Sequence, residues 1–397
     1  MLDDTGQKAL TVNSLERITL SPTATSQISP RSWAYGRFLI FGAVAMMGAV
    51  DGGGKGAIAV SMALAMITGK PLLGEKVWRP GPVAIISYED DEEEWHRRIA
   101  AACLYHGVDC RHAVEHIHFL HKPGGRVTFG VQSDGRFVSD AADIVEQLRD
   151  IDAALLIIDP FNHAHDLDDG NNNAAIAKVA GEINRVARDS RAAVLVLHHL
   201  RKGASGNPDD LMGATSLRAT FRSCRVLARM TAGEAVKLNI DDPWRYVRIA
   251  GSKENYAPPA ERGTWFRLTG VELGNATNEY PDGDEIAVAT TWQAQSPTNG
   301  MDRDKLQAVF QAFRDAIHSP VPQAQKLPWA GKPLMDKGGL IRQEATGKIR
   351  SWIEEGVLVE GEHYEPTSRN KIQKVTLDEE KAIELLARLG RSDIPQV

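Results

Sequence analysis

The chain has 397 residues, of which 43% are apolar and 25% are charged. This is the composition of ordinary globular domains, and the length predicts two or three of them. The formal net charge of -6 argues against a protein covered by a basic nucleic-acid-binding surface, although it is compatible with a local basic patch. The 3 cysteines have no metal-ligand spacing, which argues against a disulfide scaffold and is typical of a reducing cytosol.

The first part of the chain, residues 1–30, is rich in Ser and Thr and is expected to be a flexible leader. It lacks the basic start and apolar core of a signal peptide. The apolar stretch Phe38–Val50 is too short to span a bilayer and is better interpreted as a buried strand. We therefore expect a cytoplasmic protein without a membrane partner.

Residues 31–275 alternate short apolar runs with helical patterns. Runs that are apolar on both faces are typical of parallel strands covered by helices. The expected strands are Val44–Met47, Val83–Ser87, Leu155–Asp159 and Ala193–Leu197, and the expected helices are Ala57–Thr68, Glu92–His106 and Ala174–Asp189. This alternation predicts an α/β domain with a mainly parallel sheet.

A glycine-rich loop lies between the first of these strands and the first helix. Its sequence, Ala49-Val50-Asp51-Gly52-Gly53-Gly54-Lys55-Gly56, approaches the pattern GxxxxGK[ST] of phosphate-binding loops. Consecutive glycines allow backbone N–H groups to point inward and form an anion nest, to which a lysine adds a positive charge. The predicted nucleotide-binding residues are Asp51, Gly52, Gly53, Gly54, Lys55, Gly56 and Ala57.

The loop departs from the pattern at two positions, and a third residue adds an unfavourable charge. Ala49 replaces the first glycine, and Asp51 adds a negative charge beside the expected phosphate. Gly56 replaces the Ser or Thr whose hydroxyl ligates Mg²⁺, so a water must fill that position or metal binding weakens. The alternative interpretation of the loop is a glycine-rich turn with a solvent-exposed lysine.

Polar residues follow the three later strands, at the edge of an open α/β sheet where ligands bind. Glu89 is a candidate to orient and deprotonate an attacking water, or it is one of several acids that start a helix. Asp159 is a candidate Mg²⁺ ligand, or an N-capping residue. His198 and His199 could sense a phosphate, and because neighbouring residues of a strand point to opposite faces, we expect no zinc site there.

The C-terminal part begins after an expected linker over residues 276–300. Residues 301–397 show two helical patterns, two short strands around a polar loop and a last helix, which predicts a small winged-helix-like domain. Its basic residues are Arg342, Lys348, Arg350, Arg369, Lys371 and Lys374, and acidic residues lie between them. Contact with DNA phosphates and a protein-docking or purely structural role are equally compatible with this pattern.

Taken in chain order, these segments resemble the RepA-type hexameric helicases, a plasmid and prophage branch of the RecA-like AAA ATPases. The resemblance extends from about Ser32 to Trp292, and includes Ser87-Tyr88-Glu89-Asp90-Asp91, Ile158-Asp159-Pro160, His198-His199-Leu200-Arg201-Lys202-Gly203 and Lys253-Glu254-Asn255-Tyr256. It implies a RecA-like P-loop core that binds ATP and Mg²⁺, single-stranded DNA as a partner, and rings of six subunits. Gly56 departs from the family, whose members usually have Ser or Thr there.

The resemblance also implies roles for single residues. Glu89 would be the catalytic glutamate, Asp159 the Walker B aspartate and His199 the sensor at the strand end, with Lys55 on the phosphates. Arg201 and Lys202 would lie beside the site, and Arg222, Arg225 or Lys253 would reach the phosphate of a neighbouring subunit.

Two functions follow as the main hypotheses. The first is an ATP-hydrolysing motor or loader that acts on DNA in plasmid or phage replication. The second, suggested by Gly56 and Asp51, is a nucleotide-binding regulator with little or no hydrolysis that binds DNA or a protein through its C-terminal domain. A P-loop kinase is a weaker third hypothesis, because we identify no lid-like arginine cluster or acceptor pocket.

Overall fold

The computed structural model describes residues 24–50, 52–133, 136–167, 173–200, 220–238, 240–257, 264–293, 301–322, 327–364 and 371–392. The chain divides into a first unit, Met1–Ser32, and a second unit, Trp33–Val397. The described part of the first unit contains one short 3-10 helix, η1 (Thr25–Gln27). Within the described ranges, no helix has the length and apolar character needed to cross a membrane.

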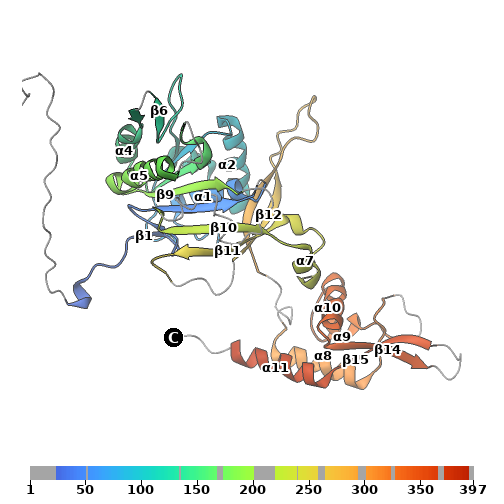
Figure 1. Cartoon of the computed structure of the whole chain (residues 1–397). Coiled ribbons are helices and arrows are strands. Elements are labelled where there is room, and N and C mark those ends of the chain that lie inside the picture. Colours follow the sequence, from blue (N-terminus) through green and yellow to red (C-terminus); the bar gives the residue numbers. More distant parts are fainter. Residues whose placement is uncertain are drawn as a thin grey trace, which may run out of the picture. The chain divides into compact units, whose positions relative to one another are not determined.

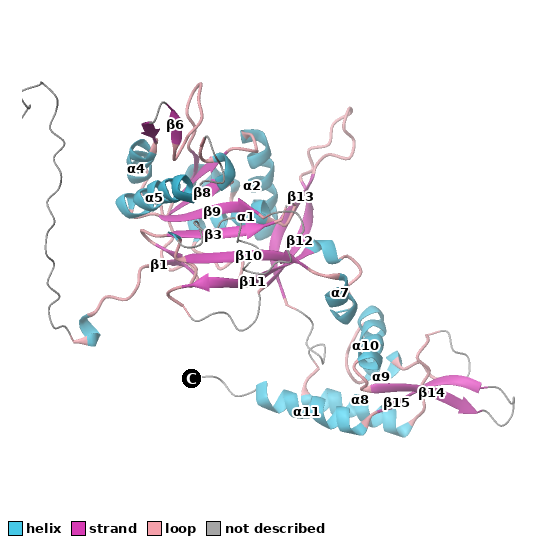
Figure 2. Cartoon of the chain, in the orientation of Figure 1, coloured by secondary structure: helices cyan, strands magenta, loops and turns pink. Residues whose placement is uncertain are grey.

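The second unit contains a nine-stranded sheet in the order β13-β12-β11-β10-β3-β9-β8-β4-β5 (Figure 1 and Figure 2). Six neighbouring strands are parallel: β10 (Ser223–Arg229), β3 (Val44–Ala49), β9 (Ala193–His199), β8 (Leu155–Asp159), β4 (Val83–Ser87) and β5 (Ile117–Phe119). The strands β11 (Tyr246–Glu254), β12 (Trp265–Glu272) and β13 (Glu285–Trp292) continue the sheet in antiparallel pairing. The predicted α/β fold with a mainly parallel sheet is therefore confirmed.

The parallel strands are buried on both faces, which explains their continuous apolar sequences. Met47 of β3 lies in one apolar cluster, together with side chains of α1 (Lys55–Thr68) and α2 (Glu92–His106). Met46, its neighbour in the chain, lies in a second cluster together with α4 (Ala141–Asp150) and α5 (Asn173–Ser190). Helices thus cover both faces, and the polar residues that follow the strands are left at one edge of the sheet.

The sheet extends further along the chain than the sequence predicts. Residues 276–300 were expected to be a linker, yet Glu285–Trp292 forms strand β13 and pairs with the whole of β12. Its alternating sequence buries Ala289 in the same apolar cluster as α1. The turn signal near Pro281 and Asp282 therefore closes a β-hairpin of the core instead of separating two domains.

The remaining elements are short and lie around the sheet. They are β1 (Trp33–Tyr35), β2 (Leu39–Ile40), α3 (Cys110–His116), β6 (Val131–Ser133), β7 (Arg136–Val138), η2 (Phe161–His163), α7 (Ala232–Leu238) and η4 (Pro243–Arg245).

The C-terminal elements enclose an apolar core of their own. They are α8 (Arg303–Asp315), α9 (Gly331–Asp336), α10 (Arg342–Glu354), β14 (Leu358–Tyr364), β15 (Lys371–Leu377) and α11 (Glu379–Ser392). Phe310 of α8 and Trp352 of α10 are fully buried, with ring centroids 5.3 Å apart. Helix α9 was not predicted, because its six residues include a proline and are too few to show a helical period.

Candidate nucleotide-binding site

The glycine loop has a backbone that only glycine adopts without strain. Gly52 and Gly54 have φ angles of 65° and 80°, in the left-handed region. A Cβ atom on Gly53 would lie 2.8 Å from the carbonyl oxygen of Val50, too close for any other residue. The Gly53 N–H donates to that same oxygen at 2.9 Å, which closes the turn. Asp51 lies outside the described residues.

A cavity of about 470 Å³ lies between this loop and the residues that follow the parallel strands. It is lined by Gly52, Gly53, Gly54, Lys55, Gly56, Ala57, Glu89, Asp90, Glu94, Arg98, Asp159, His199, Leu268, Glu285, Ile286 and Ala287. The structure thus brings the predicted phosphate-binding, catalytic and metal-binding side chains to one place. The last three lining residues belong to β13, in the segment that was expected to be a linker, so they were not predicted to lie at this site.

Glu89 lies two residues after the end of β4 and lines the cavity. Its carboxylate lies 3.3 Å from Nε2 of His199 and 3.8 Å from Nε2 of His163. The helix after it begins only at Glu92, and Asp91 caps that helix by accepting from the backbone N–H of Glu94 at 2.8 Å. The acids that start the helix are therefore Asp91 and those after it, which leaves Glu89 available at the cavity.

Asp159 ends β8 and is buried, with 8% of its surface exposed. Burial raises the pKa of its carboxyl to about 6, the positive charge of Lys55 opposes this shift, and the negative charge of Glu89 adds to it. The N-cap of the following 3-10 helix is Pro160, so Asp159 does not act as that cap. Asp159 lines the same cavity as Lys55, and its role as a Walker B aspartate stays a prediction.

The two histidines that end β9 have different surroundings. His198 packs its ring against Phe161, with centroids 6.0 Å apart, and burial lowers its pKa to about 4. A histidine that stays neutral at physiological pH brings no positive charge to a phosphate. His199 lines the cavity and contacts Glu89, so it is the better candidate for the sensor.

The loop does not supply the usual Mg²⁺ ligands. Gly56 has no hydroxyl, and a Cβ atom placed on it would lie 3.0 Å from Nη1 of Arg98. Among the residues that the structure describes, no group of three or more His, Cys, Asp or Glu is placed to hold a metal ion. The loop therefore offers no side-chain oxygen to Mg²⁺ at position 56, and the guanidinium of Arg98 lies beside the point where a side chain would begin.

Two arginines near the loop were not predicted from the sequence. The first is Arg98, in the middle of α2. Its spacing from Asp90 and Glu94 along the chain indicates ion pairs on one face of this helix, and this pattern could have pointed to it. Arg229 is the last residue of β10 and donates a hydrogen bond to the carbonyl oxygen of Gly52 at 2.5 Å. Because β10 pairs in parallel with β3, its end lies beside the loop that follows β3.

The residues that were expected to act between subunits differ in their exposure, and their role stays a prediction. Arg225 is buried against the ring of Phe38 and donates to Glu75 at 3.2 Å, so it does not reach a neighbouring subunit. Arg222 is exposed and remains a candidate. Lys253 lies in β11, where its side chain is not among the described ones, and Arg201 and Lys202 lie outside the described residues.

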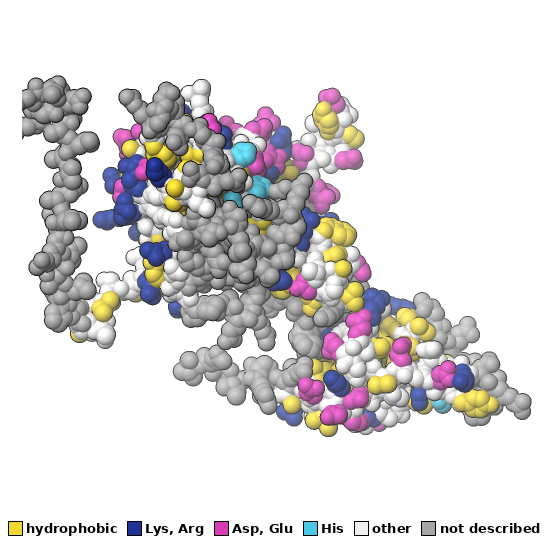
Figure 3. Space-filling model, in the orientation of Figure 1, with side chains coloured by type: hydrophobic (Ala, Val, Ile, Leu, Met, Phe, Trp, Pro, Cys, Tyr) yellow, Lys and Arg dark blue, Asp and Glu magenta, His cyan; other side chains and the backbone are white. Residues whose placement is uncertain are grey.

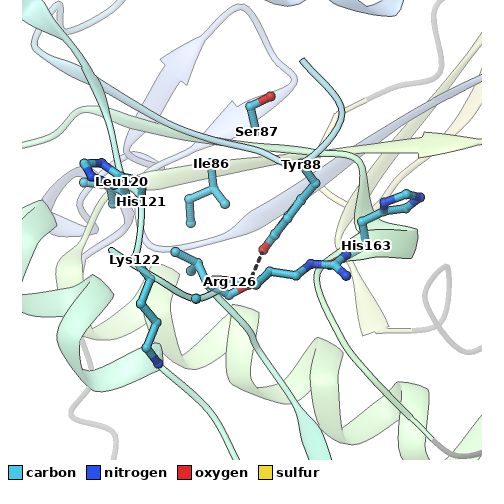
Figure 4. A pocket seen from close by; sticks show the side chains of 10 residues that line it. Ile86, Ser87, Tyr88, Leu120, His121, Lys122, Arg126 and His163 are labelled. Carbon is cyan, nitrogen blue, oxygen red and sulfur yellow. Dashed lines mark hydrogen bonds between the residues drawn. The ribbon is translucent and has the colours of Figure 1, made fainter. Parts of the chain in front are cut away.

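A second cavity, of about 290 Å³, lies beside β4 (Figure 4). It is lined by Ile86, Ser87, Tyr88, Leu120, His121, Lys122, Gly125, Arg126, Val127 and His163. The Tyr88 hydroxyl donates to the carbonyl oxygen of Val127 at 3.0 Å, and the guanidinium of Arg126 lies 4.9 Å from the Tyr88 ring centroid. His163 links the two cavities, because it lines this one and contacts Glu89 at the other.

Comparison with known proteins gives a match to a domain model over part of the chain. The family profile of the AAA domain matches residues 14–205. Among solved structures, the chain is similar to a DnaB-like replicative helicase that was studied with its interactions with primase, at 14% identity and a TM-score of 0.41, over 57% of this chain and 55% of that one. It is also similar to the RadB recombinase, at 12% identity and a TM-score of 0.36, over 58% of this chain and 88% of that one.

The chain thus spans little more than half the length of the first of these structures. Similarity at such TM-scores adds nothing about function, so the family match and the geometry of the loop carry the assignment. Lys55 and Asp159 face each other at the edge of a mainly parallel sheet, inside the matched range. Residues 14–205 thus match the AAA domain, and the described part of this range contributes most strands of an α/β fold with a mainly parallel sheet.

Proposed function

We propose that this protein binds ATP in the 470 Å³ cavity and hydrolyses it, as a motor or loader that acts on DNA in plasmid or phage replication. The observation that supports hydrolysis most directly is the position of Glu89. It lies free of the following helix, on the same cavity as Lys55 and Asp159, and within 3.3 Å of His199. An ordinary anion-binding turn has no need of such a carboxylate.

In this proposal the side chains that line the cavity bind the phosphates, accept a proton from water and bind the accompanying cation. Backbone N–H groups of the loop and the Lys55 ammonium bind the phosphates and stabilise the charge that develops in phosphoryl transfer. The Glu89 carboxylate accepts a proton from the attacking water, and His199 holds that carboxylate in place. Asp159 provides the carboxylate toward the cation that accompanies the nucleotide, and no step depends on a metal held by the loop.

The partners belong to the proposal as well. The resemblance to ring helicases supports single-stranded DNA as the activating partner and an assembly of six subunits. On the face shown in Figure 3, basic and acidic side chains are interspersed over the C-terminal elements, so no continuous basic surface is visible there. Among the described basic residues that were considered for DNA contact, Lys348 is buried and cannot reach a phosphate.

Phosphate release from ATP tests the proposal, measured with Mg²⁺, with and without single-stranded DNA. We expect DNA to stimulate the wild type and Lys55→Ala to abolish release. Glu89→Gln should lower the rate by roughly 10²-fold or more, the effect of losing a general base, while nucleotide binding persists. Glu92→Gln is the matched control, because Glu92 is exposed at the start of α2 and does not line the cavity.

The second candidate function is a nucleotide-binding regulator with little or no hydrolysis. Gly56 favours it, because the hydroxyl that ordinarily ligates Mg²⁺ is missing. Nucleotide binding that depends on Lys55, without phosphate release from the wild type, would establish this alternative. Phosphate release that survives Lys55→Ala would contradict both.

A further inference from the structure

At the edge of the phosphate loop, the guanidinium of Arg98 lies next to the backbone of Gly56. Gly56 leaves space where phosphate loops ordinarily have a hydroxyl side chain, and Nη1 of Arg98 lies 3.0 Å from the point where a Cβ atom would begin. Arg98 reaches this point from α2, and lines the same cavity as Lys55. A serine or threonine at position 56 would bring its Cβ atom into close contact with the guanidinium, which would then have to shift.

Two carboxylates hold the guanidinium in position. Nη1 and Nη2 of Arg98 donate to the two oxygens of Asp90 at 2.6 and 3.1 Å, and Nε donates to Glu94 at 2.8 Å. Asp90 and Arg98 are each about one quarter exposed, so both contact solvent through the cavity. Since the Asp90 contact uses the terminal nitrogens and the Glu94 contact uses Nε, Arg98 can exchange the first partner and keep the second.

We propose that Arg98 binds the phosphates of the nucleotide at the place left open by Gly56, where its guanidinium exchanges Asp90 for phosphate oxygens. This inference rests on the proposed nucleotide site. A guanidinium remains charged at every physiological pH and presents two parallel N–H donors, which match two phosphate oxygens as well as they match a carboxylate. The chain therefore has a fixed cation beside the loop, where related loops have a hydroxyl that ligates a metal.

Binding of ATP and ADP, measured by calorimetry on the full chain, tests this role. Arg98→Gln should weaken ATP binding by roughly 10- to 100-fold, the effect of losing charge-assisted hydrogen bonds. Arg97→Gln is the matched control: Arg97 lies on the same helix and pairs with Glu93, Asp284 and, more distantly, Glu94, but does not itself line the cavity. We expect its affinity to stay within about twofold of the wild type. Thermal melts verify that each variant is folded.

Asp90→Asn separates binding from a purely structural ion pair. If Arg98 binds phosphate, this change frees the guanidinium and removes a negative charge from the cavity, so ATP affinity should rise. If Arg98 only neutralises Asp90, the two variants break the same ion pair and both should weaken binding. Equal losses from Arg98→Gln and Asp90→Asn, or no loss from Arg98→Gln, would overturn the inference.

Gly56→Ser tests the pairing of the two positions, with Mg²⁺ and with EDTA. Alone, it should not raise ATP affinity, because its Cβ atom would meet Arg98. Combined with Arg98→Gln, it should recover affinity in Mg²⁺ and lose it in EDTA, whereas binding by the wild type should be less sensitive to EDTA. Additive effects of the two changes would contradict the pairing. Failure of the wild type to bind ATP at all would instead contradict the proposed function.

Discussion

Lys348 illustrates how the surroundings of a residue decide its role. The sequence placed it among basic residues that could contact DNA, yet in α10 it is only 5% exposed and lies next to the buried core residue Ile349. Burial lowers its pKa to about 8, and the nearby negative charge of Glu355 opposes this shift. Its amine is therefore a charged group that destabilises the folded C-terminal elements at neutral pH.

A pH-dependent stability difference follows for Lys348→Met. The lysine titrates at 10.5 in the unfolded chain and at about 8 in the folded chain, so between these values the unfolded state binds more protons and the free energy of unfolding rises with pH. At pH 7 we expect Lys348→Met to raise the free energy of unfolding by roughly 3 kcal/mol at most. Its melting temperature should therefore be higher than that of the wild type. The gain should shrink between pH 8 and 10.5.

Thermal melts at pH 7, 9 and 10.5 measure this difference. Lys337→Met is the control, because Lys337 is exposed at the end of α9 and its removal should leave the melting temperature nearly unchanged. A gain for Lys348→Met that is equal at all three pH values would show that packing, and not the charge, is responsible.

At the scale of the elements, strand β10 lies between β3, which leads into the phosphate loop, and β11, the first of the antiparallel strands. Its residue Arg225 has 8% of its surface exposed, lies 4.2 Å from the ring centroid of Phe38 and donates to Glu75. We expect Arg225→Ala to lower stability by about 3 kcal/mol or more, since it leaves a partly buried carboxylate without this partner. ATP hydrolysis per folded molecule should persist.

Arg222, three residues earlier and exposed, is the natural comparison. If it completes the site of a neighbouring subunit, Arg222→Ala should abolish hydrolysis with little change in the melting temperature. Melting curves and phosphate release, measured on both variants, distinguish the two roles. A stable Arg225→Ala protein without hydrolysis would reverse the assignment.

The elements also show which parts of the fold the sequence could predict. Strands β3, β4, β8 and β9 were predicted because they are apolar on both faces, and each is followed by the polar residues of the site. Strand β13 was assigned to a linker, because it is half exposed and alternates, and because a turn signal precedes it. Its pairing with β12 depends on contacts that neither segment shows alone.

At the scale of the whole molecule, some site residues could be predicted from the sequence around them, and others are found only from the packing of distant segments. Lys55, Glu89, Asp159 and His199 could be predicted to meet, because the ends of parallel strands lie at one edge of a sheet. Arg98 approaches the loop from the side of a helix, so no strand end indicates it. The missing hydroxyl at Gly56 was visible in the sequence, but the side chain that takes its place appears only when α2 is packed against the loop.

Assembly into a ring is the remaining proposal at the scale of the molecule, and a mixing experiment tests it. In a ring, the P-loop of one subunit and Arg222 of the next would form one site. Lys55→Ala and Arg222→Ala subunits, each inactive alone, should then recover activity when mixed. In a 1:1 mixture with random exchange, about one quarter of the interfaces receive both intact sides.

A second mixture controls for recovery that has other causes. Lys55 and Glu89 line the same cavity within one chain, so mixing Lys55→Ala with Glu89→Gln subunits cannot create a complete site. Recovery in the first mixture and not in the second would place an essential group on the neighbouring subunit. If neither mixture recovers, although labelled subunits are seen to exchange, Lys55 and Arg222 act within one chain, which contradicts the proposed site between Lys55 and the Arg222 of a neighbour.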